Sequence, residues 1–119
     1  MTAPNIVNVA TITGKTAVLE ATTTATAIVT NSAASGKVFK LNSIIVANID
    51  GTNAADITVD LFRSSVAYPI AKTITVPADA TLVVLSKETA MYLEEGDAIR
   101  CTASANSDLQ VVCSYEEIS

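Results

Sequence analysis

The feature that most constrains this chain is a period-two alternation of apolar and polar residues, in short stretches rich in threonine, valine and isoleucine. β-Branched side chains favour strands because they pack well on a pleated, half-buried surface. Turn residues recur about every ten positions, a spacing typical of sandwiches and barrels. We therefore predict an all-β fold: a single antiparallel β-sandwich or jelly-roll-like domain of about eight to ten strands.

One domain accounts for all 119 residues. Half of the residues are hydrophobic and 16% are charged, which excludes a disordered chain and is sufficient for a core. No linker, internal repeat or second domain is apparent, so we predict one domain over residues 1–119. Met1–Asn5 has little to pack internally and is predicted to be an extended arm that reaches a neighbour.

The clearest alternation lies in Val38–Ile49, which we predict to be one long strand. The residues predicted to face the core are Phe39, Leu41, Ile45, Ala47 and Ile49. Those predicted to face outward are Lys40, Asn42 and Asn48. On the next strand, the predicted inward residues are Ile57, Val59 and Leu61, with Thr58 and Asp60 outward.

The other strands are shorter and are separated by turn residues. They are expected around Ile6–Thr13, Thr16–Glu20, Thr24–Thr30, Val66–Ile70, Thr73–Val76, Thr81–Ser86 and Met91–Leu93, with Thr16–Glu20 and Thr24–Thr30 as a pair. Turns or loops are expected at Gly14-Lys15, Asn31–Gly36, Asp50–Asn53, Pro77–Asp79 and Glu94–Asp97. Pro69 predicts an edge strand or a break, because proline cannot donate to a central ladder.

The C-terminal segment predicts a hairpin around a three-residue loop, Asn106–Asp108. In this register Cys101 lies opposite Cys113 on a face where every pair is apolar. The other face places Glu116 diagonal to Arg100. A slip of one residue would turn one strand over and put the two cysteines on opposite faces, so the pattern selects this register.

Cys101 and Cys113 are the only cysteines. They could form a cross-strand disulfide or remain two small apolar side chains in the core. Nothing in the sequence indicates export, so assembly in a reducing cytoplasm is expected and reduced thiols are favoured. A catalytic thiol needs a basic partner, and two cysteines cannot supply the four ligands of a structural zinc site.

The composition argues against several classes of activity. The absence of histidine excludes Ser-His-Asp and Cys-His active sites and every histidine-based metal site. Seven basic and twelve acidic residues give a formal net charge of -5, which disfavours nucleic acid as a partner. No apolar run approaches the roughly 18 residues that span a bilayer, and Met1–Asn5 does not resemble a signal peptide. We predict no catalytic, cofactor-binding or metal-binding residues and no cofactor.

Two short patterns that could bind ligands are better explained by turns and strands. Gly14-Lys15-Thr16 matches the end of a phosphate-binding loop, but Val9 stands where that motif needs its first glycine. Asp50, Asn53 and Asp56 could surround a calcium ion, but their spacing is not that of a calcium-binding loop. An Asp-Gly turn accounts for the first of them.

The main acidic groups are Glu94, Glu95 and Asp97 and, near the end, Glu116 and Glu117. Paired carboxylates hydrolyse glycosides when a cleft holds them at a fixed separation. Sugar-cleaving sites usually also need aromatic platforms, and the chain has no tryptophan. Charged turns and a charged chain end explain these residues better, and they could also meet basic groups on a partner.

The stretch Thr22–Ala27 is locally low in complexity. It could form a flat surface that binds ice or packs against a neighbouring subunit, or it could be one solvated strand face. Only one such stretch occurs, which argues against an ice-binding array.

Four segments carry a family resemblance: Thr30–Val59, Val76–Lys87, Tyr92–Ile99 and Cys113–Ser119. They resemble small virion structural proteins of marine tailed phages, especially cyanophages and their relatives. The resemblance covers nearly the whole chain, and its motifs are structural: turns, strand starts and a chain end. It implies a β-sandwich subunit of a virus particle and provides no catalytic residues.

These features predict a non-enzymatic capsid decoration (cement) protein that binds the outer capsid surface as a symmetric homo-oligomer. Its expected partners are the major capsid protein or other virion proteins, with no nucleic acid and no membrane. Its expected location is the virion, after assembly in the host cytoplasm. Two alternatives are a tail, neck or fibre-associated structural subunit, and a carbohydrate-binding module of a host-recognition appendage. The second alternative needs an exposed aromatic platform, whereas Phe39 and Tyr115 are predicted to face inward.

Overall fold

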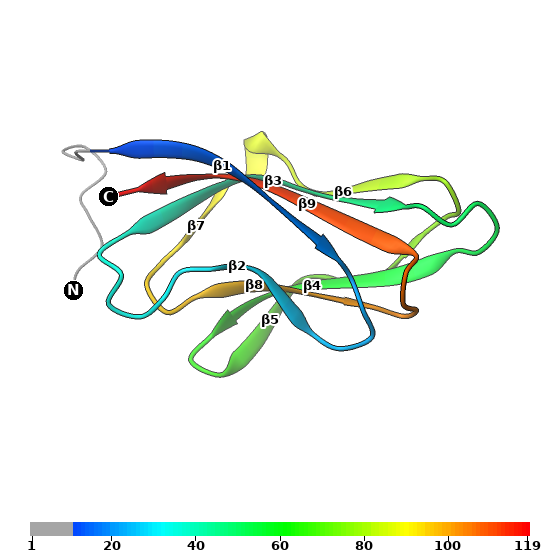
Figure 1. The fold of residues 1–119 in the computed structure, drawn as a ribbon. Helices are drawn as coiled ribbons and strands as arrows, with labels where there is room; N and C mark the ends of the chain where they lie inside the picture. Colours follow the sequence, from blue (N-terminus) through cyan, green and yellow to red (C-terminus); the bar gives the residue numbers. More distant parts are fainter. Residues whose placement is uncertain (1–10) are drawn as a thin grey trace.

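Two antiparallel sheets form the computed structural model, which describes residues 11–119 (Figure 1). Sheet A contains, in spatial order, β1 (Ile12–Glu20), β9 (Leu109–Ile118), β3 (Val38–Asn48) and β6 (Thr81–Leu85), and β7 (Met91–Leu93) also pairs with β3. Sheet B contains, in spatial order, β2 (Thr26–Thr30), β8 (Ala98–Ala103), β4 (Ala55–Arg63) and β5 (Val66–Val76). A short 3-10 helix, η1 (Lys87–Thr89), joins β6 to β7. The predicted arm, Met1–Asn5, lies outside the described residues.

The strand order is that of a jelly roll. β9 lies between β1 and β3, and β8 lies between β2 and β4, so each of the last two strands is inserted between two early ones. Most connections cross from one sheet to the other, while the turn between β4 and β5 stays within sheet B (Figure 1). A double sheet wound in this way is a jelly roll. The predicted all-β sandwich is therefore confirmed.

The core lies between the two sheets and is built from the inward faces of their strands. The largest side chains that are fully buried there include Leu41, Ile44, Val46, Ile57, Val59, Leu93, Ile99, Leu109 and Val111. The predicted inward positions of Ile57 and Val59 are confirmed, and Leu61 is half-buried against the core. Asp60 points outward as predicted but is nevertheless buried, for a reason given below.

A bulge in β3 overturns the predicted faces of this strand. The register between β3 and β9 shifts between Leu41 and Ser43, so the inward face changes from odd-numbered to even-numbered residues. Phe39 and Leu41 face the core as predicted, but beyond the bulge the buried residues are Ile44, Val46 and Asn48. The inward predictions for Ile45, Ala47 and Ile49 are wrong, and so is the outward prediction for Asn48. The Asn48 side chain donates hydrogen bonds to the carbonyls of Asn53 (3.0 Å) and Val76 (2.9 Å).

The first described strand also differs from its prediction. β1 runs straight through Gly14 and Lys15, which pair with Glu116 and Tyr115 of β9, so the predicted turn there is wrong. Alternation within β1 is weak because the strand is mostly exposed. The part of the predicted first strand before residue 11 lies outside the described residues. The expected pairing of Thr16–Glu20 with the next strand is wrong, because β1 and β2 belong to different sheets.

The predicted C-terminal hairpin is wrong. β8 belongs to sheet B and pairs with β2 and β4, whereas β9 belongs to sheet A and pairs with β1 and β3. Cys101 and Cys113 are both buried, as the apolar faces required, but they enter the core from opposite sheets. Arg100 accordingly pairs with Asp60 rather than lying diagonal to Glu116.

The remaining elements largely follow the prediction. The expected turns at Asp50–Asn53, Pro77–Asp79 and Glu94–Asp97 are present. The two strands expected over residues 66–76 form one strand, β5, which pairs with β4 and with no other strand of residues 11–119. β5 is thus an edge strand of sheet B, as Pro69 predicts.

Candidate interaction surfaces

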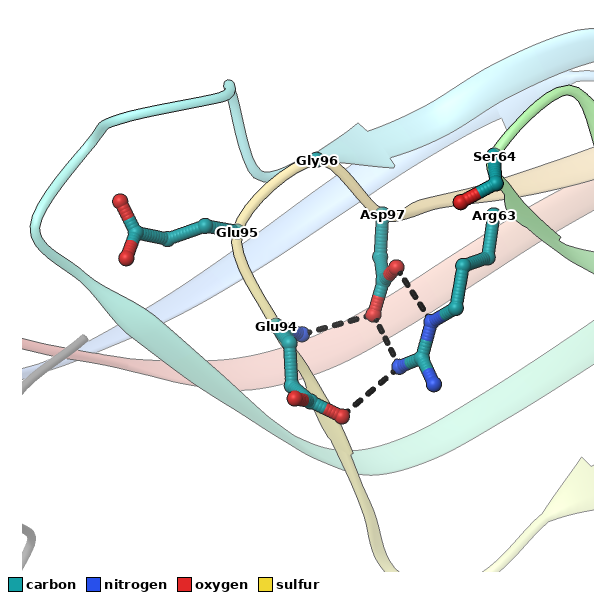
Figure 2. Close-up of a pocket in the computed structure, with 6 residues that line it drawn as sticks. All are labelled: Arg63, Ser64, Glu94, Glu95, Gly96 and Asp97. Atoms are coloured by element: carbon teal, nitrogen blue, oxygen red, sulfur yellow. Dashed lines mark hydrogen bonds and ion pairs between the residues drawn. The ribbon is translucent and has the colours of Figure 1, made fainter. Parts of the chain in front are cut away.

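A pocket of about 430 Å³ lies where the turn after β4 meets the turn between β7 and β8 (Figure 2). Arg63 and Asp97 both line it and bind each other directly. Arg63 Nε donates to Asp97 Oδ1 at 2.7 Å, and Arg63 Nη2 donates to Asp97 Oδ2 at 2.5 Å and to Glu94 Oε2 at 2.9 Å. The Glu94 amide also donates to Asp97 Oδ2, at 2.9 Å. The Asp97 side chain is only 2% exposed, whereas those of Arg63 and Glu94 are 42% and 66% exposed, so only the Asp97 end of this group is shielded from water.

The contacts between Arg63 and Asp97 favour the ionised form of both side chains. Burial alone would raise the pKa of Asp97, but the hydrogen bonds from Arg63 and the Glu94 amide, with the Arg63 charge, lower it below its usual value. The same contacts with Asp97 raise the pKa of Arg63. A general acid must release a proton near neutral pH. The Asp97 carboxylate instead accepts three hydrogen bonds that favour its ionised form, so it is not suited to that role. The ion pair therefore links the end of β4 in sheet B to the turn between β7 and β8.

The acidic groups singled out in the sequence serve separate contacts. Glu95 points away from Arg63 (Figure 2) and accepts a hydrogen bond from the Gly36 amide at 3.0 Å. Glu117 is bound by two lysines, Lys15 Nζ at 2.9 Å and Lys37 Nζ at 2.6 Å. Hydrogen bonds from these lysines lower the pKa of Glu117. Glu95 and Glu117 thus have their own partners, while Glu94 and Asp97 share Arg63.

The structure does not bring Asp50, Asn53 and Asp56 together as a calcium site. Both oxygens of Asp50 serve the turn itself: Oδ1 accepts from the Thr52 amide at 2.8 Å and Oδ2 from the Asn53 side chain at 3.3 Å. Hydrogen bonds from the Thr52 and Asn53 amides lower the pKa of Asp50. Asp56 instead accepts from the Thr75 hydroxyl at 2.7 Å. No cluster of metal-ligating residues occurs within residues 11–119.

The two cysteines are buried free thiols. Burial raises the pKa of Cys101 to about 12 and that of Cys113 to about 11. A thiol with so high a pKa is almost wholly protonated at neutral pH and is a poor nucleophile or metal ligand. Cys101 and Cys113 therefore act as small apolar core residues.

The remaining candidate segments have local explanations. The fragment Gly14-Lys15-Thr16 lies inside β1, where no helix follows it, and Lys15 binds Glu117. In the stretch Thr22–Ala27, the Thr22 and Thr26 hydroxyls both donate to the Thr24 carbonyl, at 3.1 and 3.0 Å. These hydrogen bonds stabilise the turn that connects β1 in sheet A to β2 in sheet B, so the threonines do not form a flat array.

The aromatic residues divide as predicted. Phe39 and Tyr115 pack on each other toward the core, with ring centroids 5.3 Å apart. Tyr68 and Tyr92 are exposed at 53% and 44%, but they belong to different sheets. Phe62 lies beneath Arg100, whose guanidinium carbon is 3.9 Å from the ring centroid.

The outer face of sheet B is held together by charge. Arg100 lies beside Asp60 on the neighbouring strand and donates to its carboxylate from Nε at 3.0 Å and Nη2 at 3.3 Å. The Arg100 side chain also covers Phe62, a cation–π contact. Arg100 thus lies against Asp60 as well as Phe62, which explains why Asp60 is buried although it faces outward.

The outer face of sheet A has the opposite character. The cross-strand register aligns Val18 with Val112, Val112 with Ile45, and Ile45 with Val83. These four residues, which we call the apolar row, cross the sheet from β1 through β9 and β3 to β6. Val18 is 74% exposed and Val83 is 58% exposed, while the two central residues are half-buried.

The apolar row is not predicted from the alternation in the sequence, because that pattern places Ile45 in the core. Another feature of the sequence does indicate an apolar outer face. Consecutive apolar residues occur at Ile44–Val46, Leu82–Val84 and Val111–Val112. Since adjacent residues of a strand point to opposite faces, such runs make both faces apolar.

Comparison with known proteins shows the fold of this chain. No protein-family model and no curated protein match it. A chain from Bacillus endospore appendages, a family of disulfide-linked pili, is similar over 92% of this chain and 88% of its own, with 16% identity and a TM-score of 0.54. A chain from the acid-stable capsid of Helicobacter pylori bacteriophage KHP30 is similar over 94% of this chain and 90% of its own, with 6% identity and a TM-score of 0.51.

These similarities define a class by fold. The chain shares its architecture with a phage capsid chain and with a bacterial appendage chain, and at these identities the likeness shows the fold alone. The narrower resemblance to marine tailed phages stays a prediction. No helix long and apolar enough to cross a membrane occurs within residues 11–119.

Proposed function

We propose that this chain is a non-enzymatic structural protein of a virion, and specifically a capsid decoration protein that binds the outer capsid surface as a symmetric oligomer. The observation that carries the proposal is the exposed apolar row on the outer face of sheet A. Exposed apolar residues that adjoin one another mark surfaces that meet other proteins. A decoration protein gains from such a surface, because many modest contacts add up over a closed shell.

The chemistry of the chain supports a structural role over a catalytic one. Arg63, Asp97 and Glu94 of the pocket in Figure 2 are joined through the Arg63 guanidinium, and both thiols are buried and protonated. The chain also lacks histidine altogether. The jelly roll shared with a chain from a phage capsid is in keeping with this role.

A second candidate is a tail, neck or fibre-associated subunit of the same particle. The similarity to a chain from endospore appendages favours it, since that chain belongs to a filament rather than a shell. Both candidates need the same fold and an exposed binding face. They differ in symmetry and in copy number.

Fractionation of the particle distinguishes the two candidates. Heads and tails are separated after gentle disruption, and this chain is quantified in each fraction by mass spectrometry. We expect it with the heads, at a copy number comparable to that of the major capsid protein. A low copy number with the tails would contradict decoration and support the second candidate.

A further inference from the structure

The outer face of sheet A contains a second row beside the apolar one. Thr16, Ser114 and Ser43 are aligned across β1, β9 and β3, and we call them the hydroxyl row. Neither row contains a charged residue. Beyond the hydroxyl row, Glu116 and Lys40 lie side by side on β9 and β3.

The face is close in size to the smaller specific interfaces. Strands β1, β9, β3 and β6 are 9, 10, 11 and 5 residues long, so at about 4.8 Å between strands and about 3.3 Å per residue they present roughly 550 Å². Two such faces give about 1,100 Å² in total, near the lower limit of about 1,200 Å² for a standard-sized interface. Two sheets can stack face to face about 10 Å apart, as they do inside a sandwich.

The rows match one another when a second copy is turned over. A twofold axis parallel to the strands, passing between β9 and β3, lays β9 of one copy over β3 of the other. Val112 then faces Ile45 of the partner subunit, and Val18 faces Val83 of the partner subunit. Ser114 likewise faces Ser43 of the partner subunit. A symmetric contact of this kind forms each pairing twice.

The same axis also brings opposite charges together. Lys40 takes part in no ion pair within residues 11–119, and Glu116 accepts only a long hydrogen bond, from Asn42 Nδ2 at 3.4 Å. In the turned-over pair, Lys40 lies over Glu116 of the partner subunit, and the reciprocal contact forms as well. Two copies with a formal net charge of -5 repel each other, so local complementarity matters for their association.

We propose that the outer face of sheet A is a twofold interface between two copies of this chain, with apolar row on apolar row and Lys40 over Glu116 of the partner subunit. This inference rests on the proposed function and deepens it, because it names the contact through which the symmetric oligomer forms. Its tests use the isolated chain, so their failure would remove this contact, whereas the fractionation of the particle tests the place in the virion separately.

The first test is the mass of the full chain in solution. Sedimentation equilibrium over a range of concentrations is expected to show a species of twice 12.3 kDa that dissociates on dilution. Val18→Asp and, separately, Val83→Asp are expected to raise the dissociation constant about tenfold or more, because each places a charge in the apolar row. Val66→Asp is the matched control, since Val66 is an exposed valine on sheet B, and it should leave the constant unchanged.

The second test separates contacts between copies from contacts within one copy. Lys40→Glu and Glu116→Lys are each expected to weaken self-association, because each puts like charges together in both of the reciprocal contacts, which lie side by side across the axis. Mixing the two variants is expected to restore the dimer, since every contact between the unlike chains is then attractive. Contacts within each chain do not change on mixing. Lys72→Glu, on the exposed edge strand of sheet B, controls for the change in net charge.

Two results would overturn the proposal. One is a monomer at every concentration. The other is a dimer that Val18→Asp and Lys40→Glu leave as tight as before, which would place the contact on another surface. Far-UV circular dichroism checks the fold of each variant, and the mixing experiment needs no substitution in the apolar row.

Discussion

The outer faces of the two sheets differ, although both sheets supply the same core. On sheet B, Arg100 binds Asp60 and lies over Phe62, so these charged groups are used within the chain. On sheet A, Val18 and Val83 lie at the ends of the apolar row and are exposed at 74% and 58%. A pleated strand leaves alternate side chains outside, where core packing does not select them. Sheet B therefore uses its outer face to hold the fold, whereas we propose that sheet A offers its outer face to a second copy of the chain.

The largest effect is expected from Ile44→Asp, which tests the inner face of sheet A against its outer face. Ile44 is fully buried, so a carboxylate there has no partner, and we expect a loss of about 4 kcal/mol or more that prevents folding. Ile45→Asp is the matched control on the outer face, with an expected cost of about 1 kcal/mol in the dilute chain. Circular dichroism and urea unfolding measure both. Equal losses would mean that the faces of β3 are wrongly assigned.

On the outer face of sheet B, Arg100→Met is expected to cost about 3 kcal/mol of unfolding free energy. The substitution keeps the bulk of the side chain but leaves the buried Asp60 carboxylate without its partner. Lys72→Met, on the exposed edge of the same sheet, should stay within about 0.5 kcal/mol of the unchanged chain. If the two variants lose equally little in urea unfolding, the ion pair does not hold the sheet.

Acid should weaken the end of sheet B through Asp97. Its pKa is lowered in the folded chain, whereas an unfolded aspartate titrates near about 3.9. The stabilisation from the pair with Arg63 is therefore present above that pH and lost as the pH falls through the lowered pKa. We expect Asp97→Asn to be less stable than the unchanged chain at neutral pH, with a difference that closes in acid. Urea midpoints from neutral to acid pH measure this, and Asp79→Asn, in an exposed turn, should show no such convergence.

The smallest effect on folding is expected from the apolar row itself. Val18→Ser and Val83→Ser should each change the unfolding free energy of the dilute chain by less than about 0.5 kcal/mol, because both side chains are already exposed. Phe62→Ser on sheet B should cost about 1 kcal/mol or more, since it removes the ring beneath Arg100. Urea unfolding decides. A large loss from either valine would mean that the row stabilises the single chain.

Where no bulge interrupts a strand, the alternation in the sequence predicted which side chains enter the core, but it did not show which strands are neighbours. Ile57 and Val59 were placed correctly, and both cysteines are buried. Cys101 and Cys113 were nevertheless given the wrong relation, because an apolar face can be covered by an adjacent strand or by the opposite sheet. Period-two patterns look the same in both cases.

The candidate surface was harder to predict, because it depends on one irregular position. The bulge near Asn42 reverses the faces of the second half of β3, and no local residue pattern marks it. With that reversal, Ile45 leaves the core and joins the apolar row. The Arg63–Asp97 ion pair was also missed, since it joins two segments that are far apart in the chain.

The claim that sheet A offers its outer face to a second copy can be tested most directly by hydroxyl-radical footprinting of the isolated chain, read by mass spectrometry at low and high concentration. We predict that oxidation of Val18 and Val83 falls at high concentration, while that of Phe62 and Tyr68 on sheet B does not change. Unchanged oxidation of both valines, or equal protection of the two sheets, would contradict the account.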